Sequence, residues 1–80
     1  MECKKLNSNS PFDTFTIELI KQLQQRRYTL NLSQLALDDR IGCAAGLVAK
    51  WECGNRKPTA FNLYCWAKAL DCKLTLEVEQ

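Results

Sequence analysis

The side chains that could carry chemistry in this 80-residue chain are nine carboxylates, eleven lysines and arginines and five cysteines, and histidine is absent. Without histidine no Ser-His or Cys-His pair can form, and the three glycines make no phosphate-binding loop. Asp38 and Asp39 are adjacent, so on a helix they point about 100° apart and do not face each other as an acid–base pair. We therefore expect no catalytic residue, no cofactor and no enzymatic activity.

The cysteines are odd in number, no two have the CxxC spacing, and no histidine can complete a mixed zinc site. We expect no metal site, and we interpret the cysteines as reduced, small, buried hydrophobic side chains. A redox-sensing thiol is the alternative, although nothing in the sequence marks one cysteine as activated. The residues concerned are Cys3, Cys43, Cys53, Cys65 and Cys72.

Basic residues gather in the centre of the chain. The segment 21–57 carries seven basic and three acidic residues, a local net charge of +4, whereas the whole chain carries +2. Such a segment can neutralise phosphates and supply affinity for nucleic acid that does not depend on base sequence. The alternative is that these residues form a solvated face of mixed charge. The arrangement of the helices decides between nucleic-acid binding and this alternative. The basic residues are Lys21, Arg26, Arg27, Arg40, Lys50, Arg56 and Lys57.

A long helix is expected ahead of this region. It would begin between Pro11 and Thr14, with Ser10 or Asp13 as its N-cap, and end at Asn31, because asparagine tolerates the left-handed conformation that ends helices. Its apolar residues recur every three or four positions and predict one buried stripe. The expected buried positions are Phe12, Phe15 or Thr16, Leu19, Leu23 and Leu30, and the expected exposed positions are Lys21, Gln22 and Gln25.

Two shorter helices follow around a tight turn. Ser33 is the expected N-cap of the first of them, and Gly42 supplies the positive φ of a sharp turn. The next helix is expected over residues 44–52. Two helices crossing steeply through a short glycine turn form the arrangement that presents one helix to the major groove of DNA. The apolar residues of the first of these helices are Leu35, Leu37 and Ile41, and the expected inward residues of the second are Val48 and Trp51.

A basic loop over residues 55–58 leads to a fourth helix. Thr59 is its expected N-cap. Its expected buried face is formed by Leu63, Trp66, Ala67 and Leu70. The sequence therefore predicts a mainly α domain over residues 11–71, preceded by a flexible arm over residues 1–10.

The end of the chain changes character, because residues 72–79 alternate apolar and polar side chains as a half-buried strand does. A single strand leaves its backbone groups unpaired, so it requires a partner. We expect residues 72–80 to pair with a second copy across a two-fold axis, through Leu74, Leu76 and Val78. A frayed tail or a fifth short helix is the alternative.

The chain from Arg27 to Gly54, and on to Leu70, resembles the Cro/repressor-type (Xre-like) helix-turn-helix family. The resemblance implies a four-helix, lambda-repressor-like fold, to which the C-terminal strand is added. The matching motifs are Leu32-Ser33-Gln34 at a helix start, Gly42 in the turn, Val48 as an inward aliphatic residue, and Trp51-Glu52-Cys53-Gly54.

The same resemblance implies roles for individual residues. It implies that Gln34 contacts a phosphate, and that Arg27 and Glu52 form an internal salt bridge between the first and third helices. It also implies that base edges or adjoining phosphates are contacted by Ala44, Ala45, Gly46 and Lys50, with Leu47 and Ala49 flanking them. The loop residues Asn55, Arg56 and Lys57 would contact the DNA backbone.

Three departures from the family pattern stand out. Asp38 occupies a position where the family usually has a buried alanine, so we expect its carboxylate to tilt toward solvent or to pair with Arg40 or a nearby lysine. Ala44 replaces the usual serine or threonine cap, which removes about 1 kcal/mol of helix stabilisation. The family commonly ends in a further helix, whereas this chain ends in the alternating segment.

The sequence favours a sequence-specific, dimeric DNA-binding transcriptional regulator of bacterial or phage type, which represses from a palindromic operator. Its partners would be double-stranded DNA and a second copy of the chain. An antitoxin-like or accessory module that binds a partner protein through the C-terminal strand is the alternative. No apolar run approaches the ~20 residues that span a bilayer, and the N-terminus lacks the apolar core of a signal peptide, so we expect a cytoplasmic protein.

Overall fold

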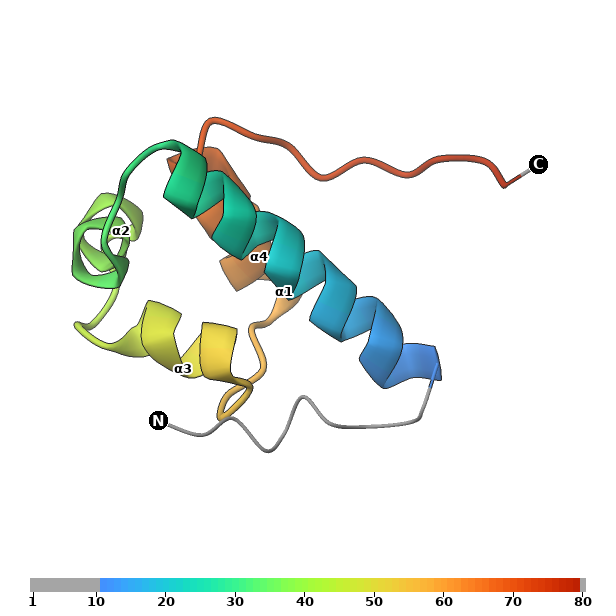
Figure 1. Cartoon of the computed structure of the whole chain (residues 1–80), viewed down its shortest axis with the longest axis horizontal. Helices are drawn as coiled ribbons and strands as arrows, with labels where there is room; N and C mark the ends of the chain where they lie inside the picture. The colour runs from blue at the N-terminus through green and yellow to red at the C-terminus, as the bar shows by residue number, and fades with distance from the viewer. Residues whose placement is uncertain (1–10, 80) are drawn as a thin grey trace.

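The computed structural model describes residues 11–79. Four helices follow one another along the chain: α1 (Pro11–Thr29), α2 (Gln34–Ile41), α3 (Leu47–Cys53) and α4 (Ala60–Ala69). The long α1 crosses the molecule, and the three shorter helices gather around its C-terminal half (Figure 1). The predicted mainly α class is confirmed, whereas the predicted arm, the Ser10 cap and the Phe12 side chain lie outside the described residues.

The buried face of α1 is formed by Ile20 and Leu23, which are 3% and 4% exposed. Phe15, one of the two alternatives predicted for this stripe, is instead 64% exposed. The reason is helical geometry, because Phe15 precedes Ile20 by five residues and so lies on a different side of the helix. Lys21, Gln22 and Gln25 are exposed, as predicted.

Asn31 ends α1 as predicted, in the left-handed conformation with φ 56°. The Leu32 N–H donates to the Arg27 carbonyl (3.1 Å) and the Asn31 N–H to the Tyr28 carbonyl (2.9 Å). These two bonds form a Schellman motif, which satisfies carbonyls at the end of the helix. The chain thereby turns sharply into α2.

The predicted caps of α2 are both present. The Ser33 Oγ accepts the Ala36 N–H at 3.0 Å, and Gly42 ends the helix with φ +84°. Of the apolar residues of α2, Leu37 is fully buried, whereas Leu35 is 64% exposed. Two residues along a helix correspond to a rotation of about 200°, so Leu35 and Leu37 cannot share one face.

The third helix is shorter than predicted, because it begins at Leu47 rather than near Ala44. Gly46 adopts φ +91°, outside the range of a right-handed helix, and so Ala44 and Ala45 belong to the turn that precedes α3. Val48 and Trp51 face inward as predicted and are 0% and 1% exposed.

The core lies where the four helices meet, and it includes Leu37 of α2. The Thr59 Oγ1 accepts the Asn62 N–H at 3.1 Å and caps α4, as predicted. Trp66, Ala67 and Leu70 of α4 are buried, and Leu63 packs against the same core. The rings of Trp51 and Trp66 stack with their centroids 5.1 Å apart, which joins α3 to α4.

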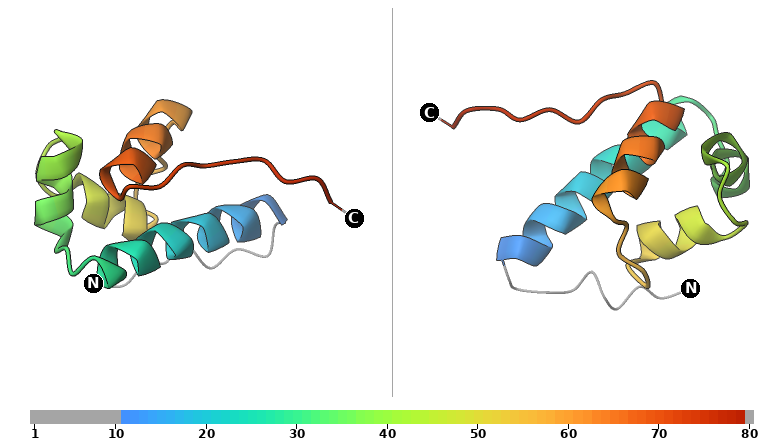
Figure 2. Two further views of the ribbon diagram at one scale, coloured as in Figure 1. Left: turned by 90° about the horizontal axis from the view of Figure 1, so that it is seen from above. Right: turned by 180° about the vertical axis from the view of Figure 1, so that it is seen from behind.

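Residues 72–79 form neither a helix nor a strand in the structure. This segment, here called the tail, leaves the end of α4 and runs away from the helices (Figure 2). Leu76 and Val78 are 99% and 88% exposed. A single chain therefore forms no strand here, and pairing with a second copy stays a prediction.

The turn at Gly42 provides a direct test of the backbone geometry. A Cβ added at Gly42 would meet no atom within 4 Å, so a Gly42→Ala variant is strained only by its positive φ. We expect it to lower the free energy of unfolding by about 1–2 kcal/mol. Thermal denaturation followed by circular dichroism measures the loss. Gly42→Asn should recover part of it, because asparagine tolerates this conformation, and equal stability of Gly42→Ala and the parent would contradict the prediction.

Candidate nucleic-acid interface

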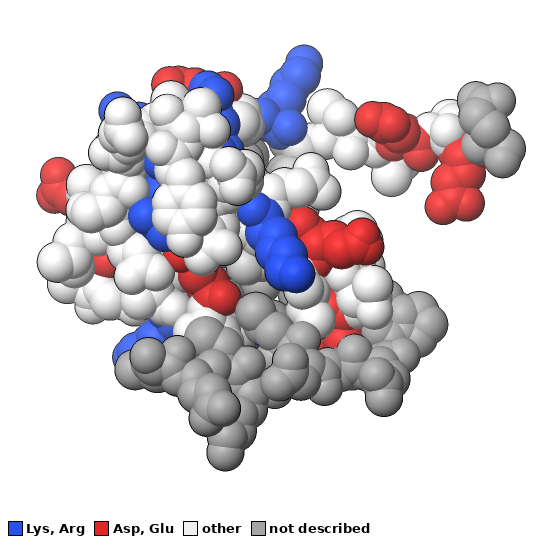
Figure 3. All heavy atoms as spheres, viewed as in Figure 1, with Lys and Arg blue, Asp and Glu red and all other residues white. Residues whose placement is uncertain are grey.

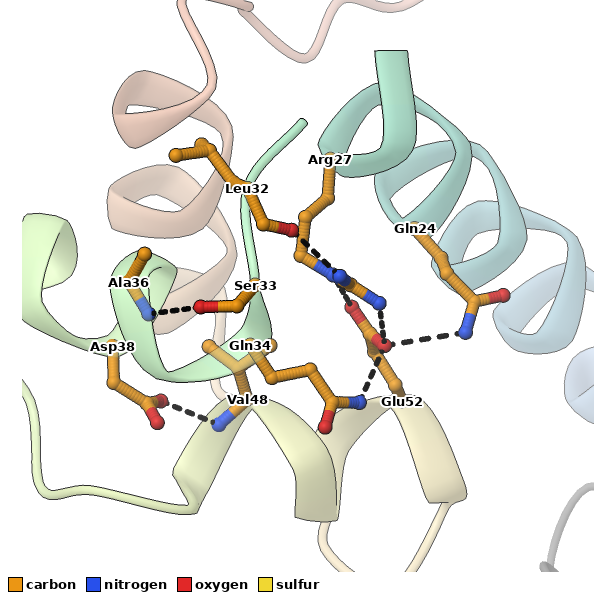
Figure 4. Close-up of polar contacts among 9 residues, drawn as sticks. All are labelled: Gln24, Arg27, Leu32, Ser33, Gln34, Ala36, Asp38, Val48 and Glu52. Carbon is orange, nitrogen blue, oxygen red and sulfur yellow. Dashed lines mark hydrogen bonds and ion pairs between the residues drawn. The ribbon is translucent and has the colours of Figure 1, made fainter. Parts of the chain in front are cut away.

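Asp38 fixes the turn between α2 and α3. Its carboxylate is buried, with the residue 2% exposed, and it accepts the Gly46 N–H through Oδ2 and the Val48 N–H through Oδ1, both at 2.8 Å. Figure 4 shows the second of these bonds, made from α2 to the first turn of α3. The expectation that Asp38 tilts toward solvent or pairs with Arg40 is therefore wrong.

The physical reason is the N-terminus of α3. The first N–H groups of a helix have no partner within the helix, and the helix dipole favours a negative charge near them. Neither Ala44 nor Gly46 carries a side chain that could cap the helix. Asp38 supplies the missing acceptor from the neighbouring helix, so two departures from the family pattern compensate for each other.

Cys43 lies in the same turn. Its Sγ is 3.5 Å from Asp38 Oδ1 and donates to that carboxylate. Burial, followed by this hydrogen bond, raises the pKa of the Cys43 thiol. A raised pKa disfavours the reactive thiolate, and this agrees with a packing role. Cys43, Cys53, Cys65 and Cys72 are free thiols.

A buried ion pair joins α1 to α3. Arg27 Nε donates to Glu52 Oε2 at 2.8 Å, and Arg27 Nη2 donates to Glu52 Oε1 at 2.9 Å (Figure 4). The two side chains are 7% and 2% exposed. The hydrogen bond to Glu52 raises the pKa of Arg27. The pairing implied by the family resemblance is thus present, in the bidentate geometry that arginine and carboxylate favour.

Two glutamines complete the network around Glu52. Gln34 Nε2 donates to Glu52 Oε1 at 2.9 Å, and Gln24 Nε2 donates to the same oxygen at 3.2 Å. Three helices therefore meet at one carboxylate. Sequence reasoning missed Gln24, although its position three residues before Arg27 places both on one face of α1.

Gln34, the residue expected to contact a phosphate, is held by this network at the start of α2. An amide nitrogen carries two hydrogens, and the bond to Glu52 uses one of them. The half-buried Gln34 side chain is thereby fixed in position relative to α3.

Not all of the central basic residues are directed to solvent. Arg26 Nε donates to the Leu70 carbonyl and Arg40 Nη1 donates to the Ala69 carbonyl, each at 3.0 Å. These bonds satisfy carbonyls at the C-terminal end of α4, where positive charge is also favoured by the helix dipole. Together with Arg27, three of the seven basic residues serve the fold. The exposed ones are Lys21, Lys50, Arg56 and Lys57, and Arg40 also retains an exposed surface.

The basic loop is bound to the last turn of α3. The Lys50 carbonyl accepts the N–H groups of Asn55 and Arg56, at 3.0 and 3.3 Å. Asn55, Arg56 and Lys57 are exposed, as is the Lys50 side chain. Backbone bonds thus hold three exposed basic side chains close to one end of α3.

The remaining expected site residues differ in exposure. Ala44 and Ala45 are exposed in the turn before α3, whereas Gly46 and Ala49 are half-buried. Leu47 is also half-buried and packs against the hydrophobic core. The exposed surface around the start of α3 therefore consists mainly of small side chains, which permit close approach of another molecule to the backbone.

Within residues 11–79, no cluster of three or more histidine, cysteine or acidic side chains could hold a metal ion. Among the described helices, none is both long enough and apolar enough to cross a membrane.

Comparison with known proteins identifies the family. A family model described as helix-turn-helix matches residues 23–76, about two thirds of the chain. No curated protein and no solved structure matches the chain. The matched span contains the α2–α3 unit, the Arg27–Glu52 pair and the basic loop. The chain belongs to the Cro/repressor-type (Xre-like) helix-turn-helix family, and its function is that of a DNA-binding transcription regulator.

Proposed function

We propose that the protein is a dimeric, sequence-specific repressor of bacterial or phage type that occupies a palindromic operator. The observation that carries this proposal is the arrangement of Lys50, Arg56 and Lys57, which are exposed at one end of a short helix whose two ends are fixed to the fold. An exposed helix with adjoining basic residues suits contact with base edges and phosphates together.

The loop supplies affinity in this proposal. Arg56 and Lys57 neutralise DNA phosphates, and Asn55 donates to the same backbone. Gln34 adds a phosphate contact through the amide hydrogen that its bond to Glu52 leaves available. None of these contacts distinguishes one base pair from another.

Sequence preference would come from the start and the exposed side of α3. Lys50 can donate to O6 and N7 of guanine, and Ala45 can pack on the methyl group of thymine. Ala44 and Gly46 carry little or no side chain and so allow the backbone to approach the groove. With one long donor per chain, DNA shape and a second half-site must contribute to specificity.

The second half-site requires a second copy of the chain. We propose that two chains associate through the tail residues Leu74, Leu76 and Val78, which would place two α3 helices about one turn of DNA apart, roughly 34 Å. A palindromic operator matches this two-fold symmetry. Repression then follows from occupation of a promoter.

Binding titrations on an operator selected from random DNA would test the DNA-binding surface. We expect Lys50→Ala to weaken specific binding by about tenfold or more, and to relax preference at the base that it contacts. Arg56→Ala or Lys57→Ala should weaken binding to all sequences and reduce the slope of log K against log salt by about 1. Fluorescence anisotropy at several salt concentrations gives both quantities.

Lys21→Ala is the matched control, because Lys21 is an exposed lysine on α1, outside α3 and its loop. It should leave specific affinity close to that of the parent. Unchanged affinity and salt slope in all three test variants would refute the proposed surface. An equal loss of affinity in the control would show that the titrations report only the net charge of the protein.

A second candidate function is favoured by the tail. Leu76 and Val78 are almost completely exposed in the single chain. An extended apolar segment can add to the sheet of another protein, as in an antitoxin-like or accessory module. Light scattering separates the candidates, because a stable dimer of the isolated protein favours the repressor and a monomer favours a missing protein partner.

A further inference from the structure

Two apolar hollows lie beside α4. One hollow, between α1 and the start of α4, is lined by Phe15, Leu19 and Ala60, among others. A second hollow, along α4 toward the tail, is lined by Ala60, Tyr64 and Lys68, and by Lys73 and Leu74 from the start of the tail. Ala60 borders both hollows. We call the surface defined by Phe15, Leu19, Ala60, Tyr64 and Lys68 the α4 track.

The α4 track exposes large aromatic side chains. Phe15 is 64% exposed and Tyr64 is 59% exposed. Aromatic side chains of this kind bury about 150–250 Å² each when they are covered. Exposed apolar side chains that gather in one patch mark a contact surface more often than scattered ones do.

The tail is the second uncovered apolar feature of the same chain. Leu74, Leu76 and Val78 alternate with polar residues, so an extended tail has one apolar face. Glu77 and Glu79 lie on the opposite face, and Figure 3 shows acidic side chains along the tail. The tail thus carries an apolar surface and negative charge together.

The tail contributes Lys73 and Leu74 to one hollow of the α4 track, but its outer residues do not lie along the track of their own chain. It leaves the C-terminal end of α4, and both views in Figure 2 show it running away from that helix. Leu76 is 99% exposed, so its side chain is not packed against its own helices.

The track and the tail match in length and charge. The ten residues of α4 extend over about 15 Å, and the five residues 74–78 span roughly 13–17 Å when extended. Lys68 lines one hollow and is opposite in sign to Glu77 and Glu79 of the tail. A tail laid along the track would cover apolar side chains and place its carboxylates near Lys68.

We propose that the α4 track of one chain receives the tail of a second copy, so that two chains exchange tails about a two-fold axis. This inference rests on the proposed homodimer and names the surface through which each chain binds the tail of the other. Two paired strands are marginally stable alone and require packing against a helix, and the track supplies that helix. Covering Phe15, Tyr64, Leu76 and Val78 removes several hundred Å² per chain from water, on the order of the ~800 Å² per partner of a standard interface.

Sedimentation equilibrium of the full chain tests the proposal. Tyr64→Glu places a negative charge on the track, opposite an acidic tail, and we expect it to raise the dimer dissociation constant by about 30-fold or more. Leu76→Glu should do the same from the side of the tail. Leu35→Glu is the matched control, because Leu35 is 64% exposed on α2 and lies outside the track, and it should leave the dimer intact.

A photo-crosslinking residue at Tyr64 then locates the partner. In a mixture of unlabelled and ¹⁵N-labelled chains, we expect cross-links between chains that map to residues 74–78. A dimer weakened by Leu76→Glu but not by Tyr64→Glu, or cross-links that map elsewhere, would overturn the tail exchange and leave the proposed homodimer standing. A chain that stays monomeric at millimolar concentration would overturn both, while the titrations with Lys50→Ala judge DNA binding separately.

Discussion

Replacing Glu52 with glutamine is expected to lower the free energy of unfolding by about 3–5 kcal/mol. Glu52 accepts two hydrogen bonds from Arg27 and one each from Gln24 and Gln34, and it is buried. A glutamine keeps the shape but turns one acceptor into a donor that faces other donors, and it leaves the Arg27 charge buried without a counter-ion. Single domains have total stabilities of about 5–15 kcal/mol, so this loss is a large fraction.

Urea denaturation followed by tryptophan fluorescence measures this loss, because the stacked Trp51 and Trp66 report on the core. Glu18→Gln is the matched control, since Glu18 is exposed on α1, and it should change stability by less than about 0.5 kcal/mol. Replacing Arg27 and Glu52 together by methionine should restore much of the stability, because no charge is then left unpaired. An unchanged denaturation midpoint for Glu52→Gln would show that the ion pair does not hold α3.

Replacing Asp38 with alanine is expected to cost about 2–4 kcal/mol. The substitution removes the acceptor of the Gly46 and Val48 N–H groups, and each unsatisfied buried N–H costs about 1–3 kcal/mol. It also removes a negative charge from the N-terminus of α3. Thermal unfolding gives the total loss, and amide hydrogen exchange at Gly46 and Val48 should accelerate more than at residues of α4.

Asp39→Ala separates this effect from a general change in charge. Asp39 is the next residue on α2 and is exposed, so its replacement should have little effect on stability. Asp38→Asn should fall between the two, because an amide keeps one acceptor oxygen. Equal stability of Asp38→Ala and Asp39→Ala would contradict the capping role.

Local signals in the sequence predicted much of the fold. Ser33 and Thr59 cap the helices that they precede, Asn31 and Gly42 adopt the left-handed conformations that end helices, and Val48 and Trp51 face the core. Each of these depends on the residue itself and on neighbours within one or two turns. The family resemblance added the Arg27–Glu52 pair, which no local pattern reveals.

The errors arose where one segment depends on another. Asp38 alone looks like a charge that should avoid burial, and its role becomes apparent only when the uncapped start of α3 lies beside it. The sequence groups Arg26 and Arg40 with the basic residues of the segment 21–57, whereas both side chains donate to carbonyls at the end of α4. The start of α3 was placed three residues early, because the sequence does not reveal that Gly46 turns left-handed.

The attachment of α3 has a consequence for engineering. This seven-residue helix is held near its two ends by carboxylates, Asp38 from α2 and its own Glu52. Ala45 and Lys50 contribute to neither attachment through their side chains. These positions can therefore be randomised as a library while α3 keeps its orientation, and variants chosen for new operators should retain the thermal stability of the parent.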